Sequence, residues 1–314
     1  MRRVLYLSHA TPDVYAIIGA AVPPGFQLLT LERDSDDERR QKIRDSEIVI
    51  VAATPFRKPV IDAAHKLELV HHQGVGWQDT TDHALLRERS IPLAFTPEGT
   101  TVGVAEHTVL LMLAILKRLP FADRELREGR FHINALRPVS REISGMTVGY
   151  VGMGRIARAL AERLAPFGTR GVFFDPNVEA EKGLAKVSLD ELLQASDIVT
   201  LHLPLTRETR HLMNRERLGR MKRGAYLVNT ARGGLVDEQA LLEVLQSGQL
   251  GGAALDVFEA EPVAAGHPLA RLPNVVLTPH IAAGTRDALV TKMKAIFDNV
   301  QRFYRGEPLA NRVF

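Results

Sequence analysis

The feature that most constrains the fold is a glycine-containing segment near the middle of the chain, residues 148–157, with the sequence VGYVGMGRIA. An apolar run leads into this segment, and residues 155–164 follow it with apolar side chains at helical spacing. The pattern predicts a strand, a tight turn and a helix in direct succession. Gly152 would form the turn. Gly154 would let the backbone approach an anion at the helix start, where unpaired N–H groups and the helix dipole favour negative charge.

An acidic residue extends this motif. The third motif position is Ala157, which still permits close packing of the helix on the strand. Asp175 ends the next apolar run and lies 21 residues after Gly154, with no Arg among the three residues that follow it. A carboxylate about 20 residues after the glycines accepts hydrogen bonds from the adenosine ribose of a dinucleotide and repels a 2′-phosphate. The glycine pattern alone would equally fit a plain strand-to-helix turn, but with Asp175 it predicts a Rossmann domain that binds NAD rather than NADP.

The composition narrows the class of protein. At 314 residues the chain is longer than one typical domain, so we expect two. With 40 Lys and Arg against 37 Asp and Glu, and no clustered basic tract, a nucleic-acid partner is not expected. The absence of cysteine excludes disulfides, thiolate metal sites and a Cys nucleophile, and it fits a cytoplasmic location. The longest apolar stretch, 109–116, is too short to span a membrane, so no membrane partner is expected.

Two series of short apolar runs alternate with polar or helical segments, which is typical of parallel strands covered on both faces. The first series comprises residues 4–7, 48–51, 69–71 and 93–95, and the second comprises 147–151, 171–174, 198–203, 225–229, 252–256 and 275–278. The sequence therefore predicts an α/β chain with two doubly wound parallel sheets. A last helix over roughly 285–304 would return to the first sheet. We expect a Rossmann NAD-binding domain, 101–284, inserted into a flavodoxin-like substrate domain of residues 1–100 plus 285–314.

Three chemically active side chains, Arg232, Glu261 and His280, follow the last three strands of the second series. Ligands of open α/β sheets lie outside the carboxyl ends of the strands, so we expect these residues to share one site. A guanidinium binds a carboxylate bidentately and polarises the adjacent carbonyl. A His near neutrality exchanges the hydroxyl proton, and a neighbouring carboxylate holds its ring. Together they suit the reduction of a 2-oxo acid, although each residue alone would also fit a structural role in its loop.

Five segments carry a resemblance to a known family. They are VGYVGMGRIA, SDIVTLHLPLT at 196–206, LVNTARGGLVDE at 227–238, ALDVFEAEP at 254–262 and LTPHIAAGT at 277–285. With them the chain resembles, over nearly its whole length, the D-isomer-specific 2-hydroxyacid dehydrogenases, which include phosphoglycerate dehydrogenase, glyoxylate/hydroxypyruvate reductase and D-lactate dehydrogenase. The resemblance implies an NAD-dependent enzyme that transfers a hydride between nicotinamide and a small D-2-hydroxy acid or 2-keto acid.

The resemblance also implies roles for individual residues. Arg232 would anchor the substrate carboxylate, and His280 would be the general acid/base with Glu261 as its partner. Val75 and Gly76 would present backbone N–H groups to the same carboxylate, although they also fit a plain glycine turn. The positions expected to contact the cofactor are Gly152, Gly154, Arg155, Ile156, Asp175, His202, Pro204, Thr209, Thr230, Ala231, Asp256, His280 and Ala282, with Asp256 holding the nicotinamide carboxamide.

Trp77 departs from the family pattern, which often has Tyr, Phe or Asp after the substrate-binding glycine. The only Trp of the chain would either line the pocket or pack on the surface, so the sequence does not identify the natural substrate.

No metal site is expected from His71, His72 and His107, because adjacent histidines on a strand point to opposite faces.

The segment 102–145 predicts a homodimer. Residues 102–119 form the most apolar helical stretch of the chain, and the arm 120–145 is rich in Arg, Glu and Pro. By the family resemblance and the apolar excess of the helix, we expect both to contact a second copy. The arm would equally fit a solvated connector.

Two other functions share this scaffold. The first is phosphonate or formate oxidation. Formate dehydrogenases of the superfamily generally carry Gln where this chain has Glu261, which argues against it. An NAD(H)-sensing binding protein of the C-terminal-binding-protein corepressor type keeps all three residues and stays the alternative to an enzyme. Such a sensor would bind NADH tightly and turn over every acid poorly.

Overall fold

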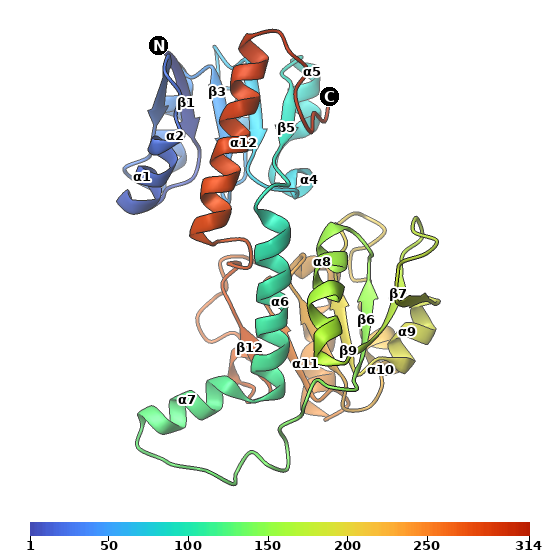
Figure 1. Ribbon diagram of the computed structural model, residues 1–314. Helices are drawn as coiled ribbons and strands as arrows, with labels where there is room; N and C mark the ends of the chain where they lie inside the picture. Colours follow the sequence, from blue (N-terminus) through green and yellow to red (C-terminus); the bar gives the residue numbers. More distant parts are fainter. The chain divides into compact units, whose positions relative to one another are not determined.

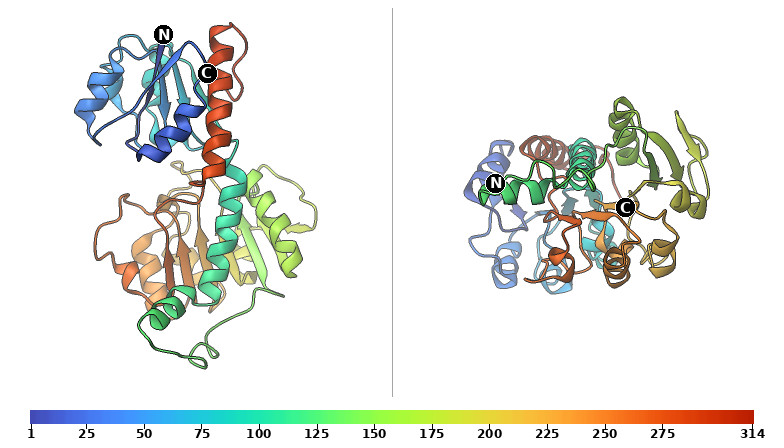
Figure 2. Two further views of the ribbon diagram at one scale, coloured as in Figure 1. Left: turned by 60° about the vertical axis from the view of Figure 1, so that its left-hand side comes forward. Right: turned by 90° about the horizontal axis from the view of Figure 1, so that it is seen from below.

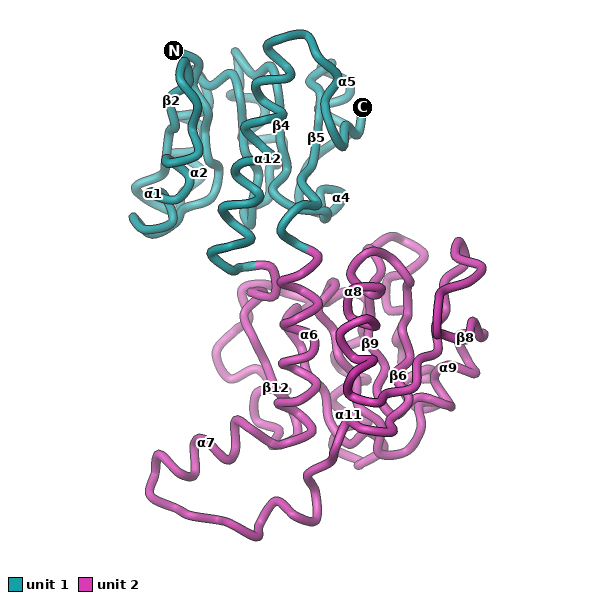
Figure 3. Tube along the Cα trace, in the orientation of Figure 1, with its two compact units in different colours: residues 1–100, 284–314 teal, residues 101–283 magenta.

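Two parallel β-sheets organise the chain in the computed structural model, which describes residues 1–314 (Figure 1). Residues 1–100 with 284–314 form one compact unit, unit 1, and residues 101–283 form another, unit 2 (Figure 3). Every strand pair in both sheets is parallel, which confirms the predicted α/β class with two doubly wound sheets. No helix combines the length and the apolar character that crossing a membrane requires.

Unit 1 has a five-stranded sheet in the order β2-β1-β3-β4-β5. Its strands are β1 (Arg2–Tyr6), β2 (Phe26–Leu29), β3 (Ile48–Val51), β4 (Leu69–His72) and β5 (Leu93–Phe95). Its helices are α1 (Pro12–Ala20), α2 (Asp36–Ile43), α3 (Lys58–Ile61), α4 (Trp77–Thr80), α5 (His83–Glu88) and α12 (Arg286–Tyr304).

Two apolar layers cover the sheet of unit 1. Val4 and Tyr6 pack in the cluster that includes α1 and α12, whereas Leu5 packs with residues of α2, α3 and α5. This division follows from the strand itself, because successive side chains point to opposite faces. The two views of Figure 2 show α12 running along this sheet near α1, which it contacts. The last helix therefore completes the cover of the first sheet, as the sequence predicts.

Unit 2 has a seven-stranded sheet in the order β12-β11-β10-β9-β6-β7-β8. Its strands are β6 (Thr147–Val151), β7 (Arg170–Phe174), β8 (Leu184–Lys186), β9 (Ile198–Leu201), β10 (Tyr226–Asn229), β11 (Gly252–Leu255) and β12 (Val275–Leu277). Its helices are α6 (Thr100–Leu116), α7 (Leu119–Arg127), α8 (Arg155–Leu164), α9 (Leu189–Ala195), α10 (Arg215–Arg220) and α11 (Glu238–Gln246). Helix α6 starts one residue before the unit boundary. Three short 3-10 helices are η1 (Ala165–Phe167), η2 (Gly233–Leu235) and η3 (Pro268–Arg271). Buried residues of α6 and α8 pack on one face of the sheet, and those of α9, α10 and α11 on the other.

Four elements differ from the sequence prediction. The strands β2 and β8 are not predicted; both are short edge strands without a fully buried residue, so they lack the signal of the central strands. The apolar helix ends at Leu116 rather than 119, because Arg118 adopts a left-handed conformation with φ of 54°. The start of the predicted arm forms α7, which has no buried residue and carries an ion pair between Asp123 and Arg127 at 2.8 Å.

Candidate active site

The glycine loop lies between β6 and α8, as predicted. Gly152 has φ of +90°, and a Cβ at this position would lie 2.6 Å from the backbone oxygen of His202. Its N–H donates to the Phe174 oxygen at 2.8 Å, which fastens the turn to the end of β7. Only glycine combines this conformation with this close approach.

Gly154 has a different reason to be glycine. Its backbone is extended, with φ of −82°, and a Cβ there would meet nothing within 4 Å. Gly154 is also the N-cap of α8 and supplies no side-chain cap, so the first N–H groups of the helix have no capping partner in the chain. Packing does not require glycine here. The open space beside an uncapped helix start fits a pyrophosphate.

Asp175 lies against this loop. One of its carboxylate oxygens accepts from the Met153 N–H and the other from the Asn177 N–H, both at 2.8 Å. These bonds fix the carboxylate at the end of β7, next to the glycine turn, where an adenosine ribose would reach it. Arg155 is exposed and Ile156 half-buried at the start of α8, and Ala157 is fully buried in the core.

Arg232 follows β10 on a loop that packs tightly on its neighbour. A Cβ on Gly233 would lie 1.9 Å from the carbonyl carbon of Phe258, so glycine is needed where the loop after β10 touches the loop after β11. The Asn229 amide donates to the Arg232 oxygen at 2.9 Å, and its side-chain oxygen accepts from the Ala231 N–H at 3.0 Å. Thr230 is buried and shares a hydrogen bond with Thr108 of α6 at 3.0 Å.

His280 and Glu261 form a direct pair. The Nδ1 atom of His280 lies 2.7 Å from Oε2 of Glu261, and Oε1 of Glu261 accepts from the Phe258 N–H at 2.9 Å. The His280 side chain is 49% exposed, so its other ring nitrogen can reach a ligand. The backbone of His280 is left-handed, with φ of +53°, a conformation that non-glycine residues seldom adopt.

The electrostatics of this pair favour an ionised carboxylate. Burial by itself would raise the pKa of Glu261. The hydrogen bonds from His280 and Phe258, with the charges of His280 and Arg232, outweigh burial and lower that pKa below its ordinary value. The loop of Arg232 touches the loop that leads to Glu261, since a Cβ on Gly233 would lie 1.9 Å from the Phe258 carbonyl carbon. The three predicted catalytic residues therefore lie on neighbouring loops.

Asp256 is fully buried at the end of β11 and organises the loop after β12. Its carboxylate accepts from the Thr278 hydroxyl at 2.6 Å and from the N–H groups of Ile281 and Ala282 at 2.9 Å each. Its backbone oxygen accepts from the His280 N–H at 2.8 Å. Asp256 thus binds residues on both sides of His280 in the sequence, Thr278 before it and Ile281 and Ala282 after it.

The remaining predicted cofactor residues lie on the loop after β9. The His202 ring shares a hydrogen bond with the Thr200 hydroxyl at 2.9 Å, and burial lowers the pKa of His202 to about 3, so this ring is neutral. The Thr209 hydroxyl donates to the Pro204 oxygen at 2.7 Å, which closes the loop on itself. All of these positions belong to unit 2.

Val75 and Gly76 lie in unit 1, on the turn between β4 and α4. Gly74 has φ of +147°, and the oxygens of Gly74 and Gly76 contact His72 Nδ1 at 3.0 Å and the Thr80 hydroxyl at 2.9 Å. Trp77 is partly buried against the core of unit 1, and its ring stands edge-on to that of His83.

Sequence reasoning does not identify Thr108, Thr278 or the place of His107, which lies beside Asp256. The His107 Nε2 atom is 3.0 Å from the Thr278 hydroxyl. No spacing rule links α6 to loops more than 120 residues later, so only the fold reveals these contacts. No group of His, Asp and Glu side chains has the arrangement of a metal site.

Comparison with known proteins identifies the family. The family model described as D-isomer specific 2-hydroxyacid dehydrogenase, NAD binding domain, matches residues 109–282. A glyoxylate reductase of Thermofilum pendens is 40% identical over 287 residues, covering 87% of this chain and 83% of the reductase. A D-3-phosphoglycerate dehydrogenase of Archaeoglobus fulgidus is 36% identical over 91% of this chain; the chain spans 55% of that enzyme's length.

A solved structure supports the family found by the sequence comparisons. An NAD-dependent formate dehydrogenase of Staphylococcus aureus in complex with NAD superposes with a TM-score of 0.88, at 31% identity, over 100% of this chain and 99% of that one. The relatives give no support to the corepressor alternative and confirm the predicted enzyme class and NAD as cofactor. The chain belongs to the D-isomer-specific 2-hydroxyacid dehydrogenase family and is an NAD-dependent oxidoreductase of that family.

Proposed function

We propose that this enzyme interconverts small 2-oxo acids and D-2-hydroxy acids, with His280 as general acid/base, Glu261 as its partner and Arg232 as carboxylate anchor. The observation that carries these roles is the 2.7 Å contact between His280 Nδ1 and Glu261 Oε2, with Arg232 close enough to lower the pKa of Glu261. Bound at the glycine loop, NAD(H) supplies the hydride acceptor or donor. The site otherwise provides binding, orientation and a proton.

The proton moves through His280. An ionised Glu261 accepts a hydrogen bond from Nδ1–H, which fixes the tautomer and stabilises the imidazolium. The exposed Nε2 then gives its proton to the substrate oxygen during reduction and takes it back during oxidation. Glu261 keeps its charge throughout because its pKa lies below the ordinary value.

Arg232 binds the carboxylate. A guanidinium offers parallel N–H donors that match a carboxylate and lie close to the neighbouring carbonyl, so it holds the substrate and polarises the bond to be reduced. We also propose that the N–H groups of Val75 and Gly76 bind a substrate acid. In support, neither of these groups donates to an acceptor within the chain.

The substrate proposed here carries no charge beyond its carboxylate. Ligands of open α/β sheets bind outside the carboxyl ends of the strands. At that edge of unit 1 the loops 7–11, 52–56 and 73–76 contain no Lys or Arg. Arg57, the next cation in sequence, donates to the backbone oxygen of Asp79. A phosphorylated acid would find no ready cation in these three loops, and Arg33 follows the edge strand β2, three positions away from β4 in the sheet.

An activity panel tests this function. We expect NADH oxidation with glyoxylate and hydroxypyruvate, with kcat/KM at least about tenfold above that for 3-phosphohydroxypyruvate, because an unpaired phosphate is poorly bound. A preference for the phosphorylated acid would overturn the substrate class. Tight NADH binding without turnover of any acid would instead support a sensor.

We further propose that residues 102–145 form a homodimer surface. Seven of the twelve exposed large hydrophobic side chains lie in this segment, among them Phe131 at 76% and Ile133 at 72% exposure. Exposed apolar side chains gathered in one segment indicate a protein contact. Light scattering should give a dimeric mass that Phe131→Glu with Ile133→Glu lowers to that of one chain, whereas a monomeric parent would refute the proposal.

A cytoplasmic location is predicted from the cysteine-free composition and stays a prediction.

A further inference from the structure

We propose that His107 of α6 is a positioning residue that sets the Asp256 carboxylate, and through it the loop of the catalytic His280, by way of the Thr278 hydroxyl. This inference rests on the proposed role of His280. His107 lies outside all five family segments described above, and its side chain is 11% exposed.

The protons of this contact can be counted. The Thr278 hydroxyl lies 2.6 Å from Asp256 Oδ1 and 3.0 Å from His107 Nε2. A hydroxyl has one proton, and Thr278 donates it to Asp256 Oδ1. The proton between Thr278 and His107 must then come from Nε2. The chain of donors runs from His107 to Thr278 to Asp256 and has one direction.

The two oxygens of Asp256 accept different numbers of hydrogen bonds. Oδ1 accepts from Thr278 and from the Ile281 N–H, and His107 Nε2 stands 3.5 Å from the same oxygen. Oδ2 accepts only from the Ala282 N–H. A carboxylate oxygen accepts two hydrogen bonds, so Oδ1 is saturated by donors within the chain, whereas Oδ2 accepts one.

The same helix supports the neighbouring loop. Thr108, the next residue, shares a hydrogen bond with Thr230 at 3.0 Å, two residues before Arg232. Val104, Ala105, Leu111 and Met112 are buried, so α6 is fixed to unit 2 beside both loops. A buried helix that touches both loops through adjacent side chains is a rigid support for catalytic geometry.

A matched pair of substitutions tests His107. His107→Leu removes the donor, whereas His107→Gln keeps an N–H donor close to the position of Nε2. We expect His107→Leu to weaken NADH binding about tenfold, because the hydrogen bond from His107 to the Thr278 hydroxyl is lost. Calorimetry without substrate measures this affinity. We expect kcat to fall by about the same factor, while KM for glyoxylate changes less than about twofold because Arg232 is untouched. His107→Gln should recover both quantities to within about threefold of the parent.

Controls keep the test decisive. Glu106→Gln, at an exposed position of the same helix, should leave NADH binding and kcat unchanged. If His107→Leu does not fold, Thr278→Val against Thr278→Ser removes or keeps the same link. Equal losses in His107→Leu and His107→Gln, or parent-like NADH binding in His107→Leu, would overturn the inference. NADH binding remains informative even if the parent reduces no 2-oxo acid, so this failure is distinct from that of the proposed function.

Discussion

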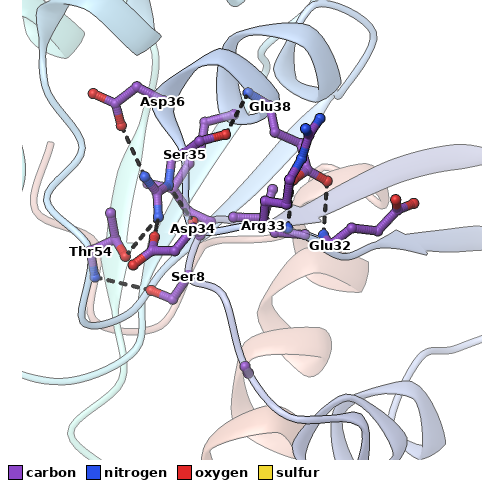
Figure 4. A network of polar contacts seen from close by, with 12 residues as sticks. Ser8, Glu32, Arg33, Asp34, Ser35, Asp36, Glu38 and Thr54 are labelled. Carbon is purple, nitrogen blue, oxygen red and sulfur yellow. Dashed lines mark hydrogen bonds and ion pairs between the residues drawn. The ribbon is translucent and has the colours of Figure 1, made fainter.

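In each sheet the strand order reverses at one point, which we call the reversal point. A glycine loop lies at the reversal point of unit 2, and charged side chains lie at that of unit 1. In unit 2 the reversal lies between β6 and β9, and the glycine loop of residues 152–154 occupies the carboxyl end of β6. In unit 1 it lies between β1 and β3, and charged side chains gather there instead (Figure 4). Open α/β sheets bind ligands at such points, so the contrast shows what a cofactor site needs beyond the architecture.

The network of unit 1 centres on Arg39, which is 5% exposed. Its Nε donates to the Leu7 oxygen at 3.0 Å, and its guanidinium pairs with Asp34 and with Asp36. It also reaches the Thr54 hydroxyl at 3.4 Å. These contacts tie the loop after β1 to the loop after β3.

Glu38 reinforces this closure. Its carboxylate accepts from the N–H groups of Glu32 and Arg33 at 2.8 and 2.7 Å, and Lys42 lies 2.6 Å away. The two loops are joined again by the Thr54 N–H, which donates to the Ser8 hydroxyl at 3.0 Å. An arginine already paired with two aspartates attracts no further anion. The reversal point of unit 1 therefore stabilises the fold, whereas we propose that the reversal point of unit 2, open at Gly154, receives the cofactor.

The sharpest test of this contrast compares valine at the two glycines. Gly152→Val should lower the free energy of unfolding by about 3 kcal/mol or more, because the new side chain meets the His202 backbone at a positive φ. Gly154→Val should cost less than about 1 kcal/mol, since its Cβ enters open space, yet it should weaken NADH binding roughly 100-fold by filling the pyrophosphate position. Urea unfolding and calorimetry measure the two effects. Tight NADH binding by Gly154→Val would break the comparison.

Arg39→Met tests the closed reversal point. It should lower the free energy of unfolding by about 2 kcal/mol, because the buried link between the Leu7 and Thr54 loops is lost. NADH affinity should not change, since Arg39 belongs to unit 1 and the glycine loop to unit 2. A large loss of NADH affinity in a folded Arg39→Met protein would show that the two points are not separate in function.

A smaller effect concerns acid stability. Burial raises the pKa of Glu38, but the backbone donors and Lys42 overcome this and lower it to about 2 in the folded chain. Since the folded pKa lies below the unfolded one, the stabilisation is present above the ordinary pKa and is lost as pH falls toward 2. Glu38→Gln should therefore lose less stability than the parent between pH 5 and pH 3, as measured by urea unfolding. Equal losses in both proteins would remove Glu38 from the account.

The sequence predicts the open reversal point better than the closed one. Gly152, Gly154 and Asp175 follow a spacing that a dinucleotide imposes, and Arg232, Glu261 and His280 stand at strand ends, where position along the chain implies position in space. The Arg39 network has no such spacing, because its partners come from three separate loops. The sequence does not predict the contact of His107 with Asp256 either, because this contact depends on how α6 packs.

The central claim is that His280, held by Glu261, exchanges the proton while the glycine loop holds the cofactor. The most direct measurement is kcat for glyoxylate reduction by His280→Gln beside its NADH affinity by calorimetry. We predict that kcat falls by roughly 10³-fold, as expected for loss of a general acid, while the Kd for NADH stays within about threefold of the parent. A kcat close to that of the parent would contradict the claim.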